Sequence, residues 1–225
     1  MKPGSIVLAL GVGLVTVAVL LACSVVQNRQ IGVDAPPYSD ESFGTVGDYL
    51  NERCGTLDCH GQVGRNLRIY GCQGLRLDPD ASPTSCAEQP TTEDEYEATY
   101  RSLVGLEPQV MTTVYSGCAS SVVDGGPTYP PATIDGVVVC HPELLTFIRK
   151  ARGTEAHKGG QLICVEAPCP AGIPQFPLDG DGGPLVDLQD VCLVTWLEGA
   201  TDTNACSTAS ASYPSFPLLD AGATE

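Results

Sequence analysis

The best candidates for chemistry in this sequence are two cysteines and a histidine, in the stretch Cys54-Gly-Thr-Leu-Asp-Cys59-His60. Two thiols followed directly by an imidazole are what covalent haem attachment requires. The thiols form thioethers with the porphyrin vinyl groups, and the imidazole binds the iron as proximal ligand. The usual spacing has two residues between the cysteines, whereas this chain has four. A Cys54–Cys59 disulfide, with His60 in a turn, explains the same residues equally well.

The N-terminus carries the features of an export signal. Lys2 precedes an apolar run from Ile6 to Ala22, which ends in Leu20-Leu21-Ala22-Cys23. This ending resembles the lipobox of bacterial lipoproteins, in which a signal peptidase cuts before a cysteine that carries diacylglycerol. The resemblance implies a signal peptide over residues 1–22, lipidation of Cys23 and, with Ser24 next, sorting to the outer membrane. An uncleaved signal anchor is the alternative, because the run is nearly long enough to span a bilayer.

Export sets how the remaining cysteines are interpreted, because the compartments outside the inner membrane are oxidising. The sequence has 11 cysteines, and removal of Cys23 leaves an even number whether or not Cys54 and Cys59 hold haem. Connectivity cannot be read from sequence, and pairing of neighbours is the simplest expectation. The expected pairs are Cys72 with Cys86, Cys118 with Cys140, Cys164 with Cys169, and Cys192 with Cys206.

The charge of the chain argues against a nucleic-acid partner. The formal net charge is −16, and it becomes −17 once residues 1–22 are lost, because Lys2 is the only charged residue among them. Such an acidic field repels phosphate and favours encounter with basic partners. The three histidines, and the lack of a nucleophile elbow or a phosphate loop, offer no catalytic constellation. The chain is therefore predicted not to be an enzyme.

Composition and periodicity predict a mainly α domain with short helices and long loops stapled by disulfides. The 25 glycines and 18 prolines favour loops. Helical periods and caps predict helices over residues 43–54 with Ser42 as N-cap, 92–104, 142–152 and 188–198. Ile134 and residues 137–139 suit a short strand. Residues 23–41 are predicted to be a tether, 42–206 the domain and 207–225 a loosely ordered tail.

Several separated stretches resemble planctomycete-type cytochrome c domains. They are Phe43, the Cys54–His60 motif with Gly61, the block Gly74-Leu75-Arg76-Leu77-Asp78, residues 141–145 and residues 193–200. The chain also resembles cysteine-rich lipoproteins of predatory soil myxobacteria, and the long cysteine spacing resembles a variant motif of multihaem cytochromes. The resemblance implies a cytochrome c-like fold with haem c held by Cys54, Cys59 and His60. The chain departs from the family in lacking the methionine-proline pair that usually precedes the tryptophan helix.

That missing pair leaves the sixth iron ligand to another residue. His157 lies in a loop bounded by Gly153 and Gly160, in the interval where the resembling domains place their methionine. We therefore predict iron ligation by His60 and His157, with Met111 as the second choice. A surface or core role is the alternative for both His157 and Met111.

The sequence gives weaker support for other kinds of site. Cys54, Cys59, Cys164 and Cys169 could hold zinc together with His60 or His141, but an oxidising compartment disfavours such thiols. Asp179-Gly-Asp181-Gly-Gly183 looks like a calcium loop without the remaining EF-hand ligands, so a turn is expected there. Arg68 and Arg76 could pair with haem propionates or bond to loop carbonyls, and Trp196 is expected in the core.

These observations favour a lipid-anchored c-type cytochrome-like haem protein that transfers single electrons in the cell envelope. Its partner would be a redox protein, with a basic docking surface favoured by the acidic charge. The alternative is a haem-free, disulfide-stapled outer-membrane lipoprotein with a structural or adhesive role.

Overall fold

The computed structural model describes residues 32–80, 86–120, 133–134, 137–138, 140–158, 160–165, 176–177 and 185–212. The expected signal peptide, the lipidated Cys23 and the Asp179–Gly183 segment lie outside these ranges. All of the described residues from Val33 onward belong to one compact unit. Among the described residues, no helix combines the length and the apolar character needed to cross a membrane.

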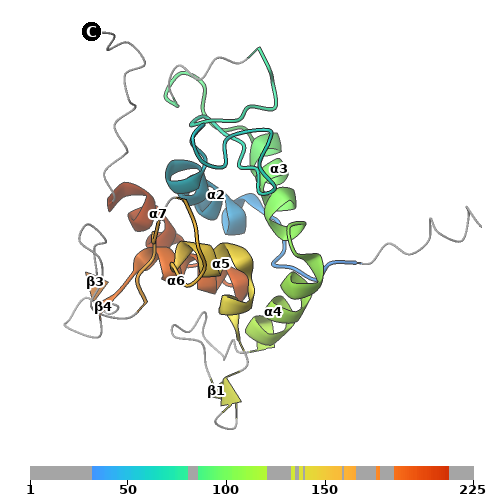
Figure 1. The fold of residues 1–225 in the computed structure, drawn as a ribbon, viewed down its shortest axis with the longest axis vertical. Coiled ribbons are helices and arrows are strands. Elements are labelled where there is room, and N and C mark those ends of the chain that lie inside the picture. The colour runs from blue at the N-terminus through green and yellow to red at the C-terminus, as the bar shows by residue number, and fades with distance from the viewer. Residues whose placement is uncertain are drawn as a thin grey trace, which may run out of the picture. The chain divides into compact units, whose positions relative to one another are not determined.

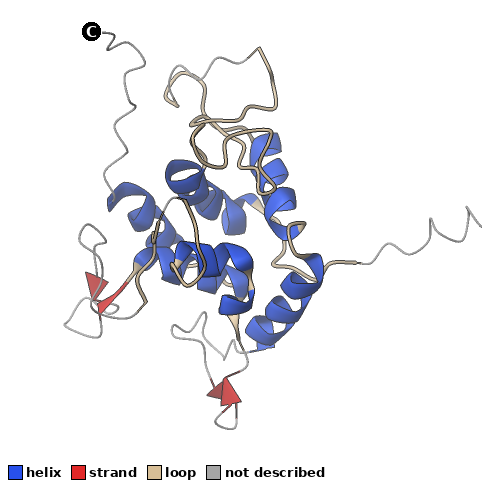
Figure 2. Cartoon of the chain, viewed as in Figure 1, coloured by secondary structure: helices blue, strands red, loops and turns tan. Residues whose placement is uncertain are grey.

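The described chain is mainly helical, as the sequence predicts (Figures 1 and 2). Two short antiparallel hairpins pair β1 (Thr133–Ile134) with β2 (Val137–Val138), and β3 (Phe176–Pro177) with β4 (Leu185–Val186). Ile134 and Val137, which were expected in one short strand, lie in two strands that pair with each other. The helices are α2 (Asp40–Cys54), α3 (Glu93–Val104), α4 (Pro108–Ser120), the 3-10 turn η1 (Pro142–Leu144), α5 (Thr146–Ala151), α6 (Leu188–Leu197) and α7 (Thr203–Ser212).

Helix ends follow local capping chemistry. Helix α3 begins with the predicted capping box, in which Thr92 and Glu95 each accept a hydrogen bond from the backbone N–H of the other. Helix α6 matches its predicted span and is followed by Gly199 at φ +78°. The N-cap predicted for α2 is wrong. Ser39 is the cap, because its side chain accepts from Ser42 N inside the first turn.

Two helices and one break were missed from the sequence. Helix α4 is rich in β-branched residues, yet it buries Met111, Val114 and Cys118. Helix α7 extends to Ser212, into the segment for which little order is predicted, and its small residues pack closely on α2 and α6. The predicted helix after Pro142 is split at Leu145, whose ψ of 128° is extended.

Helix α5 is instead held by another part of the chain. It has no side-chain cap of its own. The Glu107 carboxylate, from the turn between α3 and α4, accepts hydrogen bonds from Thr146 N at 2.6 Å and Thr146 Oγ1 at 2.8 Å. A carboxylate at a helix N-terminus satisfies unpaired N–H groups and complements the helix dipole. This contact fixes where α5 starts, and α5 carries one wall of the site described below.

The core joins α2, α6 and α7, which lie side by side, to α3 (Figure 1). Phe43 of α2 and Trp196 of α6 are fully buried, with ring centroids 5.6 Å apart. Tyr100 of α3 packs edge-on against both rings. Large aromatic side chains dominate the burial in such a core. Trp196 is therefore a core residue, as expected.

Disulfides staple the fold at the expected neighbours. The pairs Cys72–Cys86, Cys118–Cys140 and Cys192–Cys206 are formed. The last of these joins α6 to α7. Cys164 is also in a disulfide, and the expected partner Cys169 lies outside the described residues.

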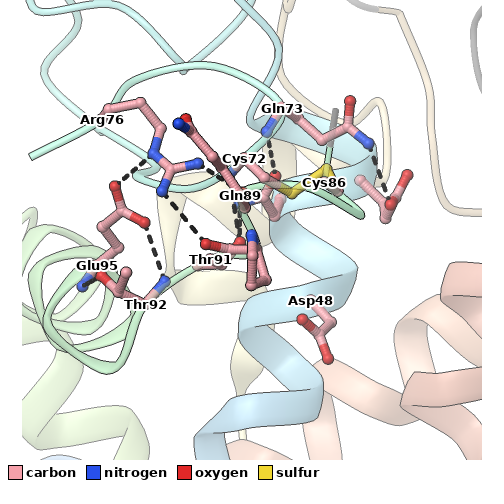
Figure 3. The surroundings of a disulfide bond; sticks show 12 residues. Asp48, Cys72, Gln73, Arg76, Cys86, Gln89, Thr91, Thr92 and Glu95 are labelled. Carbon is pink, nitrogen blue, oxygen red and sulfur yellow. Dashed lines mark hydrogen bonds and ion pairs between the residues drawn. A yellow bond between two sulfur atoms is a disulfide. The ribbon is translucent and has the colours of Figure 1, made fainter. Parts of the chain in front are cut away.

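A buried ion pair supports the loop between α2 and α3 (Figure 3). Arg76 Nε lies 2.8 Å from Glu95 Oε1, and the two side chains are 8% and 2% exposed. Arg76 also donates to Gln89 O and Pro90 O, while Glu95 accepts from Thr92 N. Removing one partner of a buried pair leaves the other charge uncompensated.

We therefore expect Glu95→Gln to lower the free energy of unfolding by about 3 kcal/mol. Glu97→Gln is the matched control, because its i,i+4 pair with Arg101 is exposed and should contribute less than about 1 kcal/mol. Urea denaturation with disulfides intact measures both values. Equal losses in the two variants would contradict the structural role of Glu95.

Candidate functional site

The Cys54–His60 motif is a compact turn at the end of α2. His60 N donates to Cys54 O at 2.9 Å, so the chain returns to the helix end after one loop. Cys59 N and Gly61 N both donate to Thr56 O, at 2.9 and 3.0 Å. The four residues between the cysteines are accommodated within this hydrogen-bonded loop, which keeps His60 beside Cys54.

Close backbone packing at two glycines holds this turn in place. A Cβ atom at Gly61 would lie 2.0 Å from Gly55 O, and one at Gly74 would lie 2.1 Å from the same oxygen. Thr56 also forms an isolated β-bridge with Gly74. No side chain fits at such distances, so both positions require glycine. The glycine after the motif and the glycine that begins the Gly74–Asp78 block thus meet at one point.

His60 is oriented as a ligand with one nitrogen committed. Its Nδ1 lies 3.1 Å from Leu67 O, and a carbonyl oxygen can only accept, so Nδ1 carries the proton. Burial lowers the pKa of His60, and the nearby His157, Arg65 and Lys150 act in the same direction. The neutral ring then keeps a lone pair on Nε2. A backbone carbonyl bonded to the other ring nitrogen is the usual support of a metal-ligating histidine.

His157 faces His60 from the segment that follows α5. The two ring centroids are 5.9 Å apart, and the ring planes differ by 13°. An imidazole nitrogen binds a metal at about 2 Å through a lone pair in its ring plane. The two rings are stacked, so they must turn toward a shared ion before both can bind it. His157 Nδ1 is 3.5 Å from Gly160 O, too far for a strong bond.

Both histidines line a pocket of about 450 Å³. Its wall includes the Cys54 thiol, and its polar residues include Arg65, Asn66, Glu107, Thr146 and Lys150. Apolar side chains from several elements supply the rest, namely Tyr49, Leu50, Leu67, Leu103, Leu106, Phe147, Ala151, Leu162 and Leu193. A largely apolar cavity with a few convergent polar groups is typical of a small-molecule or cofactor site.

The other candidate ligands lie elsewhere. Met111 is 1% exposed in the hydrophobic core and is not part of the pocket wall. His141 is exposed, with Nδ1 2.8 Å from Glu143 Oε1. Of the candidate sixth ligands, His157 is therefore the one that shares the pocket with His60.

The two motif cysteines are free thiols in the described part of the chain. Cys54 is partly exposed as a residue, but desolvation of its sulfur raises the pKa of this thiol to about 12. A thiol protected in this way stays protonated at neutral pH. Cys54 and Cys59 are free, whereas the other cysteines in the described ranges are all in disulfides.

The arginines singled out by sequence do not reach the pocket. Arg76 pairs with Glu95, and Arg68 Nε donates to Arg65 O at 3.2 Å, so both fit the structural alternative. The cations of the pocket wall are Arg65 and Lys150, which the sequence analysis missed. Arg65 lies closest to the motif in sequence and donates to Cys59 O at 2.9 Å.

The donor set differs from that of a bare metal site. Within the described ranges, no three His, Cys, Asp or Glu side chains gather as an ion-binding group. Cys164 is in a disulfide, so it cannot serve as a ligand in the zinc alternative. Two stacked imidazoles and a thiol beside an apolar pocket are residue types that can hold haem c.

Burial of Cys54 gives a testable reactivity. The test uses haem-free Cys59→Ser protein under non-reducing conditions, which leaves Cys54 as the free thiol of the motif. At pH 8 we expect Cys54 to react with iodoacetamide at least about tenfold more slowly in the folded protein than in the same protein unfolded in urea. The reason is that the thiolate is the nucleophile, and burial keeps the thiol protonated. Mass spectrometry of the labelled peptide follows the reaction. Equal rates in the folded and unfolded protein would show that the sulfur is solvated.

The chain was also compared with known proteins. No protein-family model, curated protein or solved structure matches it. The interpretation of the pocket therefore rests on its own residues and geometry, together with the motif resemblance described above.

Proposed function

We propose that this protein is a lipid-anchored c-type haem protein that carries single electrons in the cell envelope. The observation that supports the proposal best is the pairing of His60 and His157 in one apolar pocket beside the free Cys54 thiol. Each of these residues suits the haem c interpretation of the Cys54–His60 motif.

Haem is held by four residues in this proposal. Cys54 and Cys59 form the thioethers, His60 is the proximal ligand, and His157 is the distal ligand. When bound, haem supplies reversible one-electron chemistry. The chain contributes the rest. Leu67 O orients the His60 ring, and the apolar side chains of the pocket wall supply a surface for the porphyrin.

Charge and ligand type set the properties of the carrier. Two histidine ligands give a lower potential than histidine with methionine, so we propose a low-potential carrier. Arg65 and Lys150 place positive charge in the pocket wall of a chain whose formal charge is −16. These cations are suited to compensate the carboxylates of a haem propionate.

The remaining parts of the proposal come from the sequence. Lipidation of Cys23 would attach the domain to the envelope, most simply at the outer membrane, through residues 23–41. The acidic charge would speed encounter with a redox partner that has a basic docking surface. The disulfides favour the second candidate, a haem-free structural or adhesive lipoprotein, because they are sufficient to staple the loops by themselves.

Purified mature protein from its native envelope separates the two candidates. We expect red protein with a c-type absorption spectrum, in which the colour stays with the protein after acid-acetone extraction. Acid-acetone extracts a non-covalently bound haem, but it cannot extract a haem that is bound by thioethers. Colourless protein with Cys54 joined to Cys59 would reject the proposal and support the haem-free candidate.

The distal ligand is tested by substitution. We expect His157→Ala to let carbon monoxide bind the ferrous protein, because the sixth position loses its ligand. His141→Ala and the volume-conserving Met111→Leu should leave the spectra unchanged. A sulfur-to-iron charge-transfer band at the red end of the ferric spectrum, abolished in Met111→Leu, would instead make Met111 the ligand.

A further inference from the structure

His157 is carried by a short segment, residues 153–158, which we call the His157 segment. Its base is fixed by a buried bidentate pair in which Arg152 donates to both Asp190 oxygens at 2.8 Å. Gly153 turns the chain at φ +74°, and Thr154 N donates to Arg149 O at 3.0 Å. These contacts position the start of the segment but lie some residues before His157 itself.

One carboxylate ties the segment to α5 closer to His157. Glu155 Oε2 lies 3.0 Å from Arg149 Nε, and Glu155 Oε1 lies 3.0 Å from Lys150 Nζ. Lys150 Nζ also donates to Ala156 O at 3.1 Å, on the residue directly before His157. Lys150 lines the pocket as well. Glu155 and Lys150 together therefore form a bridge from α5 to the backbone that carries the His157 ring.

We infer that Glu155 is a positioning residue for His157, whose ion pairs with Arg149 and Lys150 keep the His157 ring opposite His60. The inference deepens the proposed function, on which its haem measurement rests. Loss of the carboxylate removes both ion pairs and leaves the part of the segment next to His157 tied to α5 by the bond from Lys150 Nζ to Ala156 O.

Glu155→Gln and its control Glu143→Gln test the inference. Glu143 is a similarly exposed glutamate on η1 that pairs with His141, outside the His157 segment. In the haem protein at pH 7, Glu155→Gln should raise the rate of carbon monoxide binding roughly 1.4- to fivefold, the range expected for exposed ion pairs. Glu143→Gln should match the unaltered protein.

The haem-free chain provides a measurement that does not depend on the proposed function. At pH 8 the stacked His60 ring should shift the His157 C2 proton in the NMR spectrum, and Glu155→Gln should reduce that shift while Glu143→Gln retains it. If Glu155→Gln leaves both the shift and the carbon monoxide rate unchanged, or if both variants alter them equally, Glu155 has no positioning role. Protein without haem but with the expected NMR change would reject the proposed function and retain the inference.

Discussion

The site depends on one close backbone contact at the end of α2. Gly61 and Gly74 approach Gly55 O so closely that a Cβ atom on either would fall about 2 Å from that oxygen. This contact joins the helix end, the motif turn and the loop that leads to the Arg76–Glu95 pair. Because hydrogen bonds to Thr56 O and Cys54 O complete the turn, the position of His60 follows from backbone packing. The motif thus has a rigid support that involves no cofactor.

The second wall of the pocket is positioned by polar contacts between distant parts of the chain. Glu107 caps α5, Arg152 binds Asp190 of α6, and Glu155 bridges α5 to the His157 segment. One histidine is therefore held by a backbone turn and the other by side-chain ion pairs. The His60 side is expected to be the more rigid, because exposed ion pairs are the weaker support. In a haem protein with such a site, the proximal ligand would be held more firmly than the distal ligand.

Local chemistry made part of this structure predictable. The Thr92–Glu95 capping box defines the start of α3, and short sequence separations favoured the disulfides that formed. Helices α4 and α7 were missed because tertiary packing stabilises them against weak local propensity. Arg65 and Lys150 were missed for a related reason, since only the fold brings them to one pocket. The prediction that paired His157 with His60 came from a family resemblance, and the structure places the two rings 5.9 Å apart, while iron ligation stays a prediction.

The central claim is that Cys54 and Cys59 hold a haem, and peptide mapping of the native mature protein tests it most directly. Proteolysis without reduction, followed by mass spectrometry, isolates the peptide that contains Cys54, Cys59 and His60. The account predicts that this peptide carries one haem through bonds to both sulfurs. A peptide without haem, in which Cys54 and Cys59 are joined to each other, would contradict the account.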